Sequence, residues 1–475
     1  MNTLYNGVQF PCDGPDLKNI ERIDHGCISM VTAMMSRGLQ IDLSHFAQME
    51  KQLTEDMERI TETVKNITGH YINLGSGDQV SDLLHRVLGI RQPKVKLTKS
   101  GDRESVDYEA LVAIQHEHEV VPNILDYKEL EKLRGTYVVP MPKLARRTAH
   151  GVWRMFPNLG QTRVPSGRFN CKEPNLLAFP TRTKRGRQIR HGFITEPGWC
   201  YLSVDFSQFE PRAAAHYSGD AGLMRVFENE EDLYSDFAIG AFSLPDQRHQ
   251  DDAGKWHYPG VDKDEHRFPS KTCTLASLYD VTAIGLQEQM PVICANCLKP
   301  ASADKDDVEV HDCGDFEPLW TEDKCQEIIN AFYIKYPGLL RDRHRHHGRA
   351  RRYGYLWDDW GRLHHVAAVR SVHPWVVSSA LREAGNFPYQ ALNAGALKIS
   401  MAQIHDELTE AGILGDVAWS LLPIHDELVF ECRNDVAEEV GIYTKEVFEN
   451  CVPLKVPVKA EFKTGVDVTT WGHAK

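Results

Sequence analysis

Two stretches of the chain each present a carboxylate beside an apolar run. In the first, residues 199–206, a run rich in β-favouring residues carries Asp205 next to its end. In the second, residues 419–432, apolar flanks enclose a charged tip that contains His425 and Asp426. These patterns predict a buried strand and a β-hairpin. Paired carboxylates repel each other unless a cation neutralises them. Asp205 and Asp426 therefore indicate a magnesium site, provided that folding brings them together.

The residues after Asp205 predict a sharp change from strand to helix. Ser207 and Glu210 have the spacing of a capping box, and residues 212–216 favour a helix, with Pro211 in its first turn. An ordinary strand-to-helix connection with a capping residue is the alternative for this junction.

Four further residues recur at steps of four, so a helix would place them on one broad face. They are Arg267, Lys271, Leu275 and Tyr279. The two cations are suited to a triphosphate, and the aromatic ring to a base. An amphipathic helix with two solvated cations is the structural alternative.

Composition indicates a globular chain with an uneven charge distribution. The 475 residues are enough for two or three subdomains, and their formal charge is −13. Residues 143–190 nevertheless hold twelve Lys or Arg and one acidic residue, and a second basic cluster covers 341–352. Either run could be a solvated face, but two runs that flank the carboxylate motifs favour a track for phosphates.

The chain shows no sign of membrane insertion or secretion. It has no run of 18 apolar residues, and its first residues form neither a signal nor a transit peptide. Its eleven cysteines are too scattered for a secreted disulfide framework, so we expect them to be reduced. These features predict a cytoplasmic protein.

The three motifs together resemble motifs A, B and C of family A DNA polymerases, the DNA polymerase I family. The likeness runs from about residue 20 to the C-terminus. It implies an α+β, right-hand polymerase fold, with an antiparallel sheet in the palm and a helical thumb and fingers. The implied organisation is an N-terminal arm (1–19), thumb (20–140), palm with motif A (141–215), fingers (216–350) and palm with motif C (351–475). Helical spacing predicts paired long helices over 20–39 and 43–66 of the thumb, and a hydrophilic loop over 247–265.

The resemblance also implies roles for individual residues. Asp205 and Asp426 would hold two Mg²⁺ ions, with Glu427 in a supporting role and Lys271 acting on the triphosphate. The dNTP would contact Arg267, Lys271, Leu275, Tyr279, Gln208 and Glu210. Primer and template DNA would contact Arg168, Asn175, Arg182, Arg382, Asn386, Gln390 and His425.

Several positions depart from the family pattern. Leu275 replaces an aromatic residue, Asp280 a glycine, Tyr234 a histidine and Ala178 an asparagine. A second His-Asp-Glu-Leu sequence begins at His405, but it continues a helical pattern and lacks flanking strands. We therefore expect Asp426, and not Asp406, to be the catalytic copy.

Residues 291–320 look like an insertion in the fingers. Cys294, Cys297, His311 and Cys313 have the spacing of a four-coordinate structural zinc site. Reduced cysteines on a surface loop explain the pattern equally well.

The expected activity is template-directed DNA synthesis with Mg²⁺, on primer-template DNA and dNTPs. Fewer than twenty residues precede the predicted thumb, so we expect no 3′–5′ proofreading by this chain. We also expect a monomer, a compact phage-type member that acts in phage DNA replication or repair in the host cytoplasm, and a separate exonuclease or processivity factor. The rivals are a single-subunit phage-type RNA polymerase, which lacks the counterpart of Glu210, and a non-catalytic DNA-binding remnant.

Overall fold

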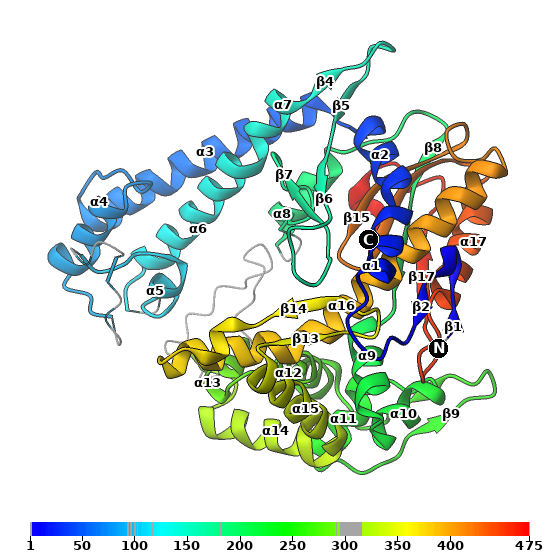
Figure 1. The fold of residues 1–475 in the computed structure, drawn as a ribbon. Helices are drawn as coiled ribbons and strands as arrows, with labels where there is room; N and C mark the ends of the chain where they lie inside the picture. The colour runs from blue at the N-terminus through cyan, green and yellow to red at the C-terminus, as the bar shows by residue number, and fades with distance from the viewer. Residues whose placement is uncertain are drawn as a thin grey trace.

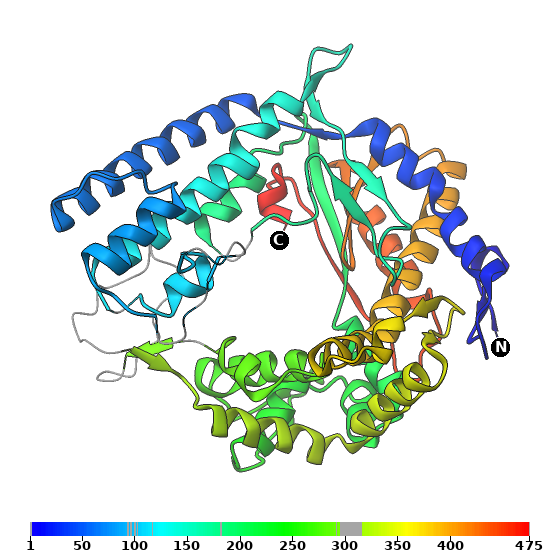
Figure 2. The same ribbon diagram turned by 60° about the vertical axis from the view of Figure 1, so that its left-hand side comes forward.

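The structure, a computed structural model, describes most of the chain. It omits residues 1, 93, 94, 96, 99, 100, 102, 116, 181, 182, 291, 295–315 and 475, and for 292–294 and 316–318 it gives the backbone alone. Two helical regions lie on opposite sides of a body that contains the main sheet (Figure 1, Figure 2). This arrangement is the mixed fold that the sequence predicted, with an antiparallel sheet at its centre.

The central sheet has four antiparallel strands in the order β15-β16-β8-β17. Their bounds are β8 (Trp199–Phe206), β15 (Ala418–Ile424), β16 (Glu427–Arg433) and β17 (Ala460–Lys463). Helix α17 (Ala437–Asn450) packs on β8 and β17, and α2 (Ile28–Arg37) packs on β15. Covering by helices explains why β8 and β16 are buried almost throughout instead of alternating between a buried and an exposed face.

A long helix pair forms the first helical region. Helix α3 (Leu43–Thr68) begins at the N-cap Asp42, ends at Gly69 with φ 72°, and packs its apolar stripe against α6 (Val120–Leu133). The predicted pairing of 20–39 with 43–66 is wrong. The first segment breaks at Cys27 into α1 (Leu17–Gly26) and α2, and both pack against α16 (Pro374–Glu410). Their apolar residues are buried against α16 and, for α2, also against β15, instead of against α3.

The first sixteen residues are more regular than the predicted arm. Strands β1 (Asn2–Thr3) and β2 (Gln9–Phe10) pair with each other, and the Phe10 ring lies 4.6 Å from the Trp360 ring. The backbone N–H of Cys12 donates to the carbonyl of Asp359. These partners lie far along the chain, so local periodicity gave no sign of them.

The second helical region contains six helices among the described residues. They are α10 (Ala221–Glu228), α11 (Leu233–Ala241), α12 (Phe268–Leu278), α13 (Ala283–Gln287), α14 (Glu322–Lys335) and α15 (Pro337–Tyr353). The predicted loop over 247–265 is partly ordered, with a small hairpin of β9 (His249–Gln250) and β10 (Trp256–His257). A π-helical turn, η4 (Lys263–Arg267), leads directly into α12.

The remaining helices and strands are short. The helical ones are η1 (Tyr5–Gly7), α4 (Gly77–Ser81), η2 (Asp82–Val87), α5 (Tyr108–Val112), η3 (Arg134–Val138), α7 (Pro140–Leu144), α8 (Lys184–His191), α9 (Phe209–Ser218), η6 (Ala367–Arg370) and η7 (Trp471–Ala474). The strands are β3 (Leu39–Gln40), β4 (Arg146–Arg147), β5 (Trp153–Met155), β6 (Asn158–Gly160), β7 (Asn170–Lys172), β11 (Val292–Cys294), β12 (Phe316–Pro318), β13 (Tyr355–Trp357) and β14 (Leu363–His365). None of the described helices is long and apolar enough to cross a membrane.

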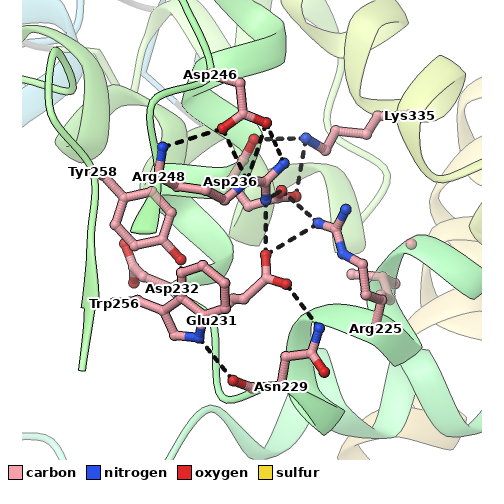
Figure 3. A network of polar contacts seen from close by, with 12 residues as sticks. Arg225, Asn229, Glu231, Asp232, Asp236, Asp246, Arg248, Trp256, Tyr258 and Lys335 are labelled. Atoms are coloured by element: carbon pink, nitrogen blue, oxygen red, sulfur yellow. Dashed lines mark hydrogen bonds and ion pairs between the residues drawn. The ribbon is translucent and has the colours of Figure 1, made fainter. Parts of the chain in front are cut away.

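A buried carboxylate ties the helices of the second region together (Figure 3). Asp236 on α11 is fully buried and accepts hydrogen bonds from Arg225 (2.6 Å), Arg248 (2.5 Å) and Tyr336 (2.8 Å). The ammonium group of Lys335 lies 2.9 Å from the same carboxylate. Burial alone would raise the pKa of Asp236, but these partners outweigh it, and Lys335 contributes most to holding the pKa below its usual value.

We predict that Asp236→Asn lowers the free energy of unfolding by about 2–3 kcal/mol, because it removes the buried negative charge that Arg225, Arg248 and Lys335 share. The folded pKa of Asp236 lies below the unfolded value of about 3.9, so its contribution is complete above that pH. The contribution disappears as the pH falls through the folded pKa. Urea unfolding of both proteins at neutral pH and at decreasing pH measures this difference. Equal stability at neutral pH would contradict the prediction, and the exposed Asp251→Asn serves as the control.

Candidate active site

The two predicted metal-binding carboxylates lie near the same end of the sheet, Asp205 on β8 and Asp426 in the turn just before β16. Asp205 stands directly opposite Glu427 in the β8–β16 pairing. Asp426 belongs to the two-residue turn between β15 and β16, in which His425 has φ 57°. The backbone carbonyl of Asp426 accepts a 3.2 Å hydrogen bond from the N–H of Phe206. Asp205 and Asp426 are half-buried, and Glu427 is 1% exposed. Sheet pairing therefore brings together residues that are 221 positions apart (426 minus 205).

This donor set suits Mg²⁺. Hard carboxylate oxygens are its preferred protein ligands, and it is commonly held by one or two carboxylates together with substrate phosphates. Across the part of the chain that the structure describes, no three His, Cys, Asp or Glu side chains gather into a metal-binding group of their own. A cation at Asp205 and Asp426 would therefore draw further ligands from a substrate or from water.

A fourth acidic residue lies beside Asp205, Asp426 and Glu427, and the sequence patterns did not indicate it. Glu461 on β17 stands opposite Asp205, on the side away from Glu427, and is exposed. Cross-strand partners point to the same face of a sheet. No motif marks Glu461, and only the strand register reveals its position.

Glu210 bonds to two of the predicted substrate-binding residues instead of capping its helix. Its carboxylate accepts hydrogen bonds from Arg168 and from the hydroxyl of Tyr279. The predicted capping box is wrong, because Gln208 occupies the N-cap of α9 with φ 55° and no side chain caps the helix. Burial, aided by the charge of Asp426, raises the pKa of Glu210 against the opposing effect of Arg168.

The predicted triphosphate-binding cations differ in their surroundings. Lys271 on α12 is exposed, and its ammonium group lies 5.8 Å from the centre of the Tyr234 ring. Arg267, just before α12, is half-buried and donates two hydrogen bonds to Asp232, at 2.8 and 2.9 Å. The sequence analysis missed Asp232, which also caps α11. Of the two cations, Lys271 is the more accessible to an incoming anion.

Two departures from the family pattern have a structural context. Burial, followed by the charge of Asp232, raises the pKa of Tyr234 to about 12, so its hydroxyl keeps its proton. Asp280 has φ 58°, a conformation that favours glycine, and its carboxylate is paired with Arg343 at 2.8 Å. Leu275 is half-buried on α12. Asp280 thus combines a backbone conformation typical of glycine with a side chain that binds Arg343.

The predicted DNA-binding residues fall into several places. Arg382, Asn386 and Gln390 follow one another at four-residue steps along α16 and are half-buried. Arg168 donates a hydrogen bond to the Glu210 carboxylate, and His425 is exposed at the hairpin turn. Asn175 is exposed and accepts a hydrogen bond from the N–H of Leu177. Arg182 lies outside the described residues.

The zinc prediction cannot be placed in the structure. Cys297, His311 and Cys313 lie outside the described residues, and Cys294 is described only as backbone in β11. The zinc site therefore stays a prediction. The eight cysteines whose side chains are described are all buried and free, as the prediction of reduced thiols requires.

The second His-Asp-Glu-Leu sequence lies within a helix, as predicted. Asp406 lies within α16 and accepts a 2.8 Å hydrogen bond from the Tyr5 hydroxyl. Its neighbour Glu407 accepts one from Tyr443. This copy links structural elements and does not face Asp205 across the sheet.

Known proteins resemble nearly the whole chain. The family model for DNA polymerase family A matches residues 43–473. The thermostable DNA polymerase I of Thermus filiformis is 31% identical over 458 residues, covering 96% of this chain and 48% of the relative. That of Thermus aquaticus is 30% identical over 448 residues, covering 94% and 47%. The chain thus spans about half the length of these relatives.

A solved structure has the same architecture. The POL domain of Pol1 from M. smegmatis, in complex with DNA primer-template and dNTP, aligns with a TM-score of 0.78 and 25% identity. The alignment covers 96% of this chain and 73% of that chain. The predicted fold is therefore confirmed, and the chain belongs to DNA polymerase family A.

Proposed function

We propose that this chain is a DNA-dependent DNA polymerase, which joins dNMPs to the 3′-hydroxyl of a primer with release of pyrophosphate. The observation that carries the proposal is the pairing of β8 with β16, which brings Asp205 beside Asp426. The M. smegmatis relative binds primer-template and dNTP, which supports the same substrates here. A non-catalytic remnant would have no use for carboxylates that repel phosphate.

In this proposal, Asp205 and Asp426 hold two Mg²⁺ ions, and Glu427 supports them from a buried position. Bound Mg²⁺ would supply positive charge to the reacting phosphate and oxygen atoms. Lys271 and Arg267 neutralise the triphosphate, Tyr279 lies at the templating end, and Gln208 and Leu275 flank the nucleotide. Arg168, Asn175, Arg182, Arg382, Asn386, Gln390 and His425 contact primer and template.

A primer-extension assay tests the proposal. The purified chain should extend a recessed primer when all four dNTPs and Mg²⁺ are present, and EDTA should abolish the extension. Extension that survives complete removal of divalent cations would contradict the metal assignment. No extension under any condition would contradict the proposed activity.

The half-buried Glu210 should discriminate between dNTPs and rNTPs, because its bulk would block the 2′-hydroxyl of a ribonucleotide. We predict that Glu210→Ala raises the rNTP-to-dNTP ratio of kcat/KM by roughly 10- to 200-fold, the effect of relieving one small steric clash. Single-nucleotide incorporation with matched dNTP and rNTP measures this ratio. The control Glu407→Ala, on α16, should not change it. A wild-type preference for rNTPs would instead favour the RNA polymerase alternative.

We further propose that this 475-residue chain does not excise mismatched primer ends. The polymerase family model matches residues 43–473, and the M. smegmatis POL domain aligns with 96% of the chain. This coverage supports the proposal. Release of the terminal nucleotide from a mismatched primer by the purified chain would refute it. The five-part domain division, monomeric state, phage role, cytoplasmic location and separate exonuclease or processivity factor stay predictions.

A further inference from the structure

An aromatic pair lies on the surface at the start of α16. The rings of His373 and Trp375 stack, with centroids 4.6 Å apart and an interplanar angle of 27°. Trp375 is nevertheless 69% exposed, and the adjacent Val372 is 89% exposed. Exposed clusters of large apolar side chains commonly mark an interaction site. A flat, exposed aromatic surface is suited to a planar ligand.

Positive charge lies beside this pair. Arg351 and Arg352, at the end of α15, and Arg370, at the end of η6, are all exposed. Helix α15 packs against both α16 and η6. Of the acidic side chains near this surface, Asp280 is already paired with Arg343, and Glu383 with His364 at 3.0 Å. The surface therefore offers cations for phosphate groups next to aromatic rings for bases.

A cavity is lined by chain neighbours both of this pair and of Tyr279, the residue predicted at the templating end. It has a volume of about 450 Å³, and its lining includes Val372 and Pro374 on one side and His347 and Arg351 on another. Asp280, which directly follows Tyr279, completes the lining. The Nε2 atom of His347 is buried and has no hydrogen-bond partner among the described residues. The volume falls within the range of roughly 300–1,000 Å³ that is usual for small-ligand sites.

We propose that His373 and Trp375, with Arg351 beside them, bind unpaired nucleotides of the template strand that lie ahead of the templating base. The inference rests on the proposed polymerase function. Single-stranded nucleic acid is bound by this combination of stacking rings and cations. The cavity at Asp280 gives the strand a route from Tyr279 to the aromatic pair. The next turns of α16 carry Arg382 and Asn386, so one helix would contact the template on both sides of the insertion site.

Two primer-templates test the proposal. They share a duplex, but one template ends at the templating nucleotide and the other continues for about ten unpaired nucleotides. Trp375→Ala should weaken binding to the long template by about fivefold or more, the range expected for loss of one base stack. Its affinity for the short template should stay within about twofold of the wild type. Fluorescence anisotropy of a labelled primer measures both affinities at one fixed salt concentration, because phosphate contacts depend on salt.

Two further variants control for indirect effects. Trp375→Phe keeps an aromatic ring and should retain most of the preference for the long template. Ile334→Ala removes an exposed apolar side chain (80% exposed) from α14 and should leave both affinities unchanged. An equal loss of affinity for the two templates would overturn the proposal. Unchanged affinity for both templates would also overturn it, and would leave a protein partner as the occupant of this surface. A wild type that binds and extends neither template would instead refute the proposed function itself.

Discussion

Asp426→Asn is expected to reduce the rate of dNMP incorporation by at least about a thousandfold. The substitution keeps the size of the side chain but removes the negative charge from one of two neighbouring carboxylates. Stabilisation by a bound metal is worth several kcal/mol, and about 4 kcal/mol corresponds to a thousandfold in rate. Single-turnover incorporation of one dNTP on a recessed primer measures the effect. DNA affinity should change far less than the rate.

Asp406→Asn provides a matched control, because the two aspartates occupy identical His-Asp-Glu-Leu sequences. Asp406 lies within α16 and accepts a hydrogen bond from Tyr5, so its replacement should cost some stability and little rate. An inactive Asp406 variant together with an active Asp426 variant would reverse the assignment. Thermal melting of both variants would show whether a lost rate reflects unfolding.

Lys271→Met should lower kcat/KM for dNTPs by about 100- to 1,000-fold, the usual cost of removing one group that stabilises charge in a transition state. Met retains the length and apolar stem of Lys, so the fold of α12 should persist. The exposed Lys271 is free to reach a triphosphate, with only the Tyr234 ring close to its ammonium group among the contacts of the described residues. Steady-state incorporation at varied dNTP concentration gives kcat and KM separately.

Arg267→Met is the informative comparison. Arg267 already donates two hydrogen bonds to Asp232, and a triphosphate would have to compete for it. Its replacement should therefore lower kcat/KM less than that of Lys271, and should lower the melting temperature more, because Asp232 loses its partner. A larger kinetic effect at Arg267 would show that the Asp232 pair opens when the nucleotide binds.

Sequence patterns predicted the parts of the site that depend on local periodicity. The apolar runs around Asp205 and Asp426 form β8 and the β15–β16 hairpin. Of the residues spaced by four, Lys271 and Leu275 lie within α12, Arg267 ends η4 just before it, and Tyr279 is its C-cap. Such patterns succeed because a buried strand or an amphipathic helix must present apolar side chains at fixed intervals.

Features that depend on distant partners were not predictable in this way. Ser207 and Glu210 have capping-box spacing, but Arg168 and Tyr279 offer the Glu210 carboxylate stronger partners than a helix terminus does. Likewise, α1 and α2 have helical periodicity that does not say which surface they cover. Glu461 lacks any local signal, since only its register against β8 places it beside Asp205.

The shortness of the turn at His425 and Asp426 has a consequence for how this protein can vary. With only two residues linking β15 to β16, the turn itself has no slack, and a residue added to or removed from β16 would shift its register against β8 by about 3.3 Å. Substitutions along β8 and β16 therefore keep this register, whereas an insertion or deletion within β16 would change it. The pairing of β8 with β16 therefore sets the separation between Asp205 and Asp426.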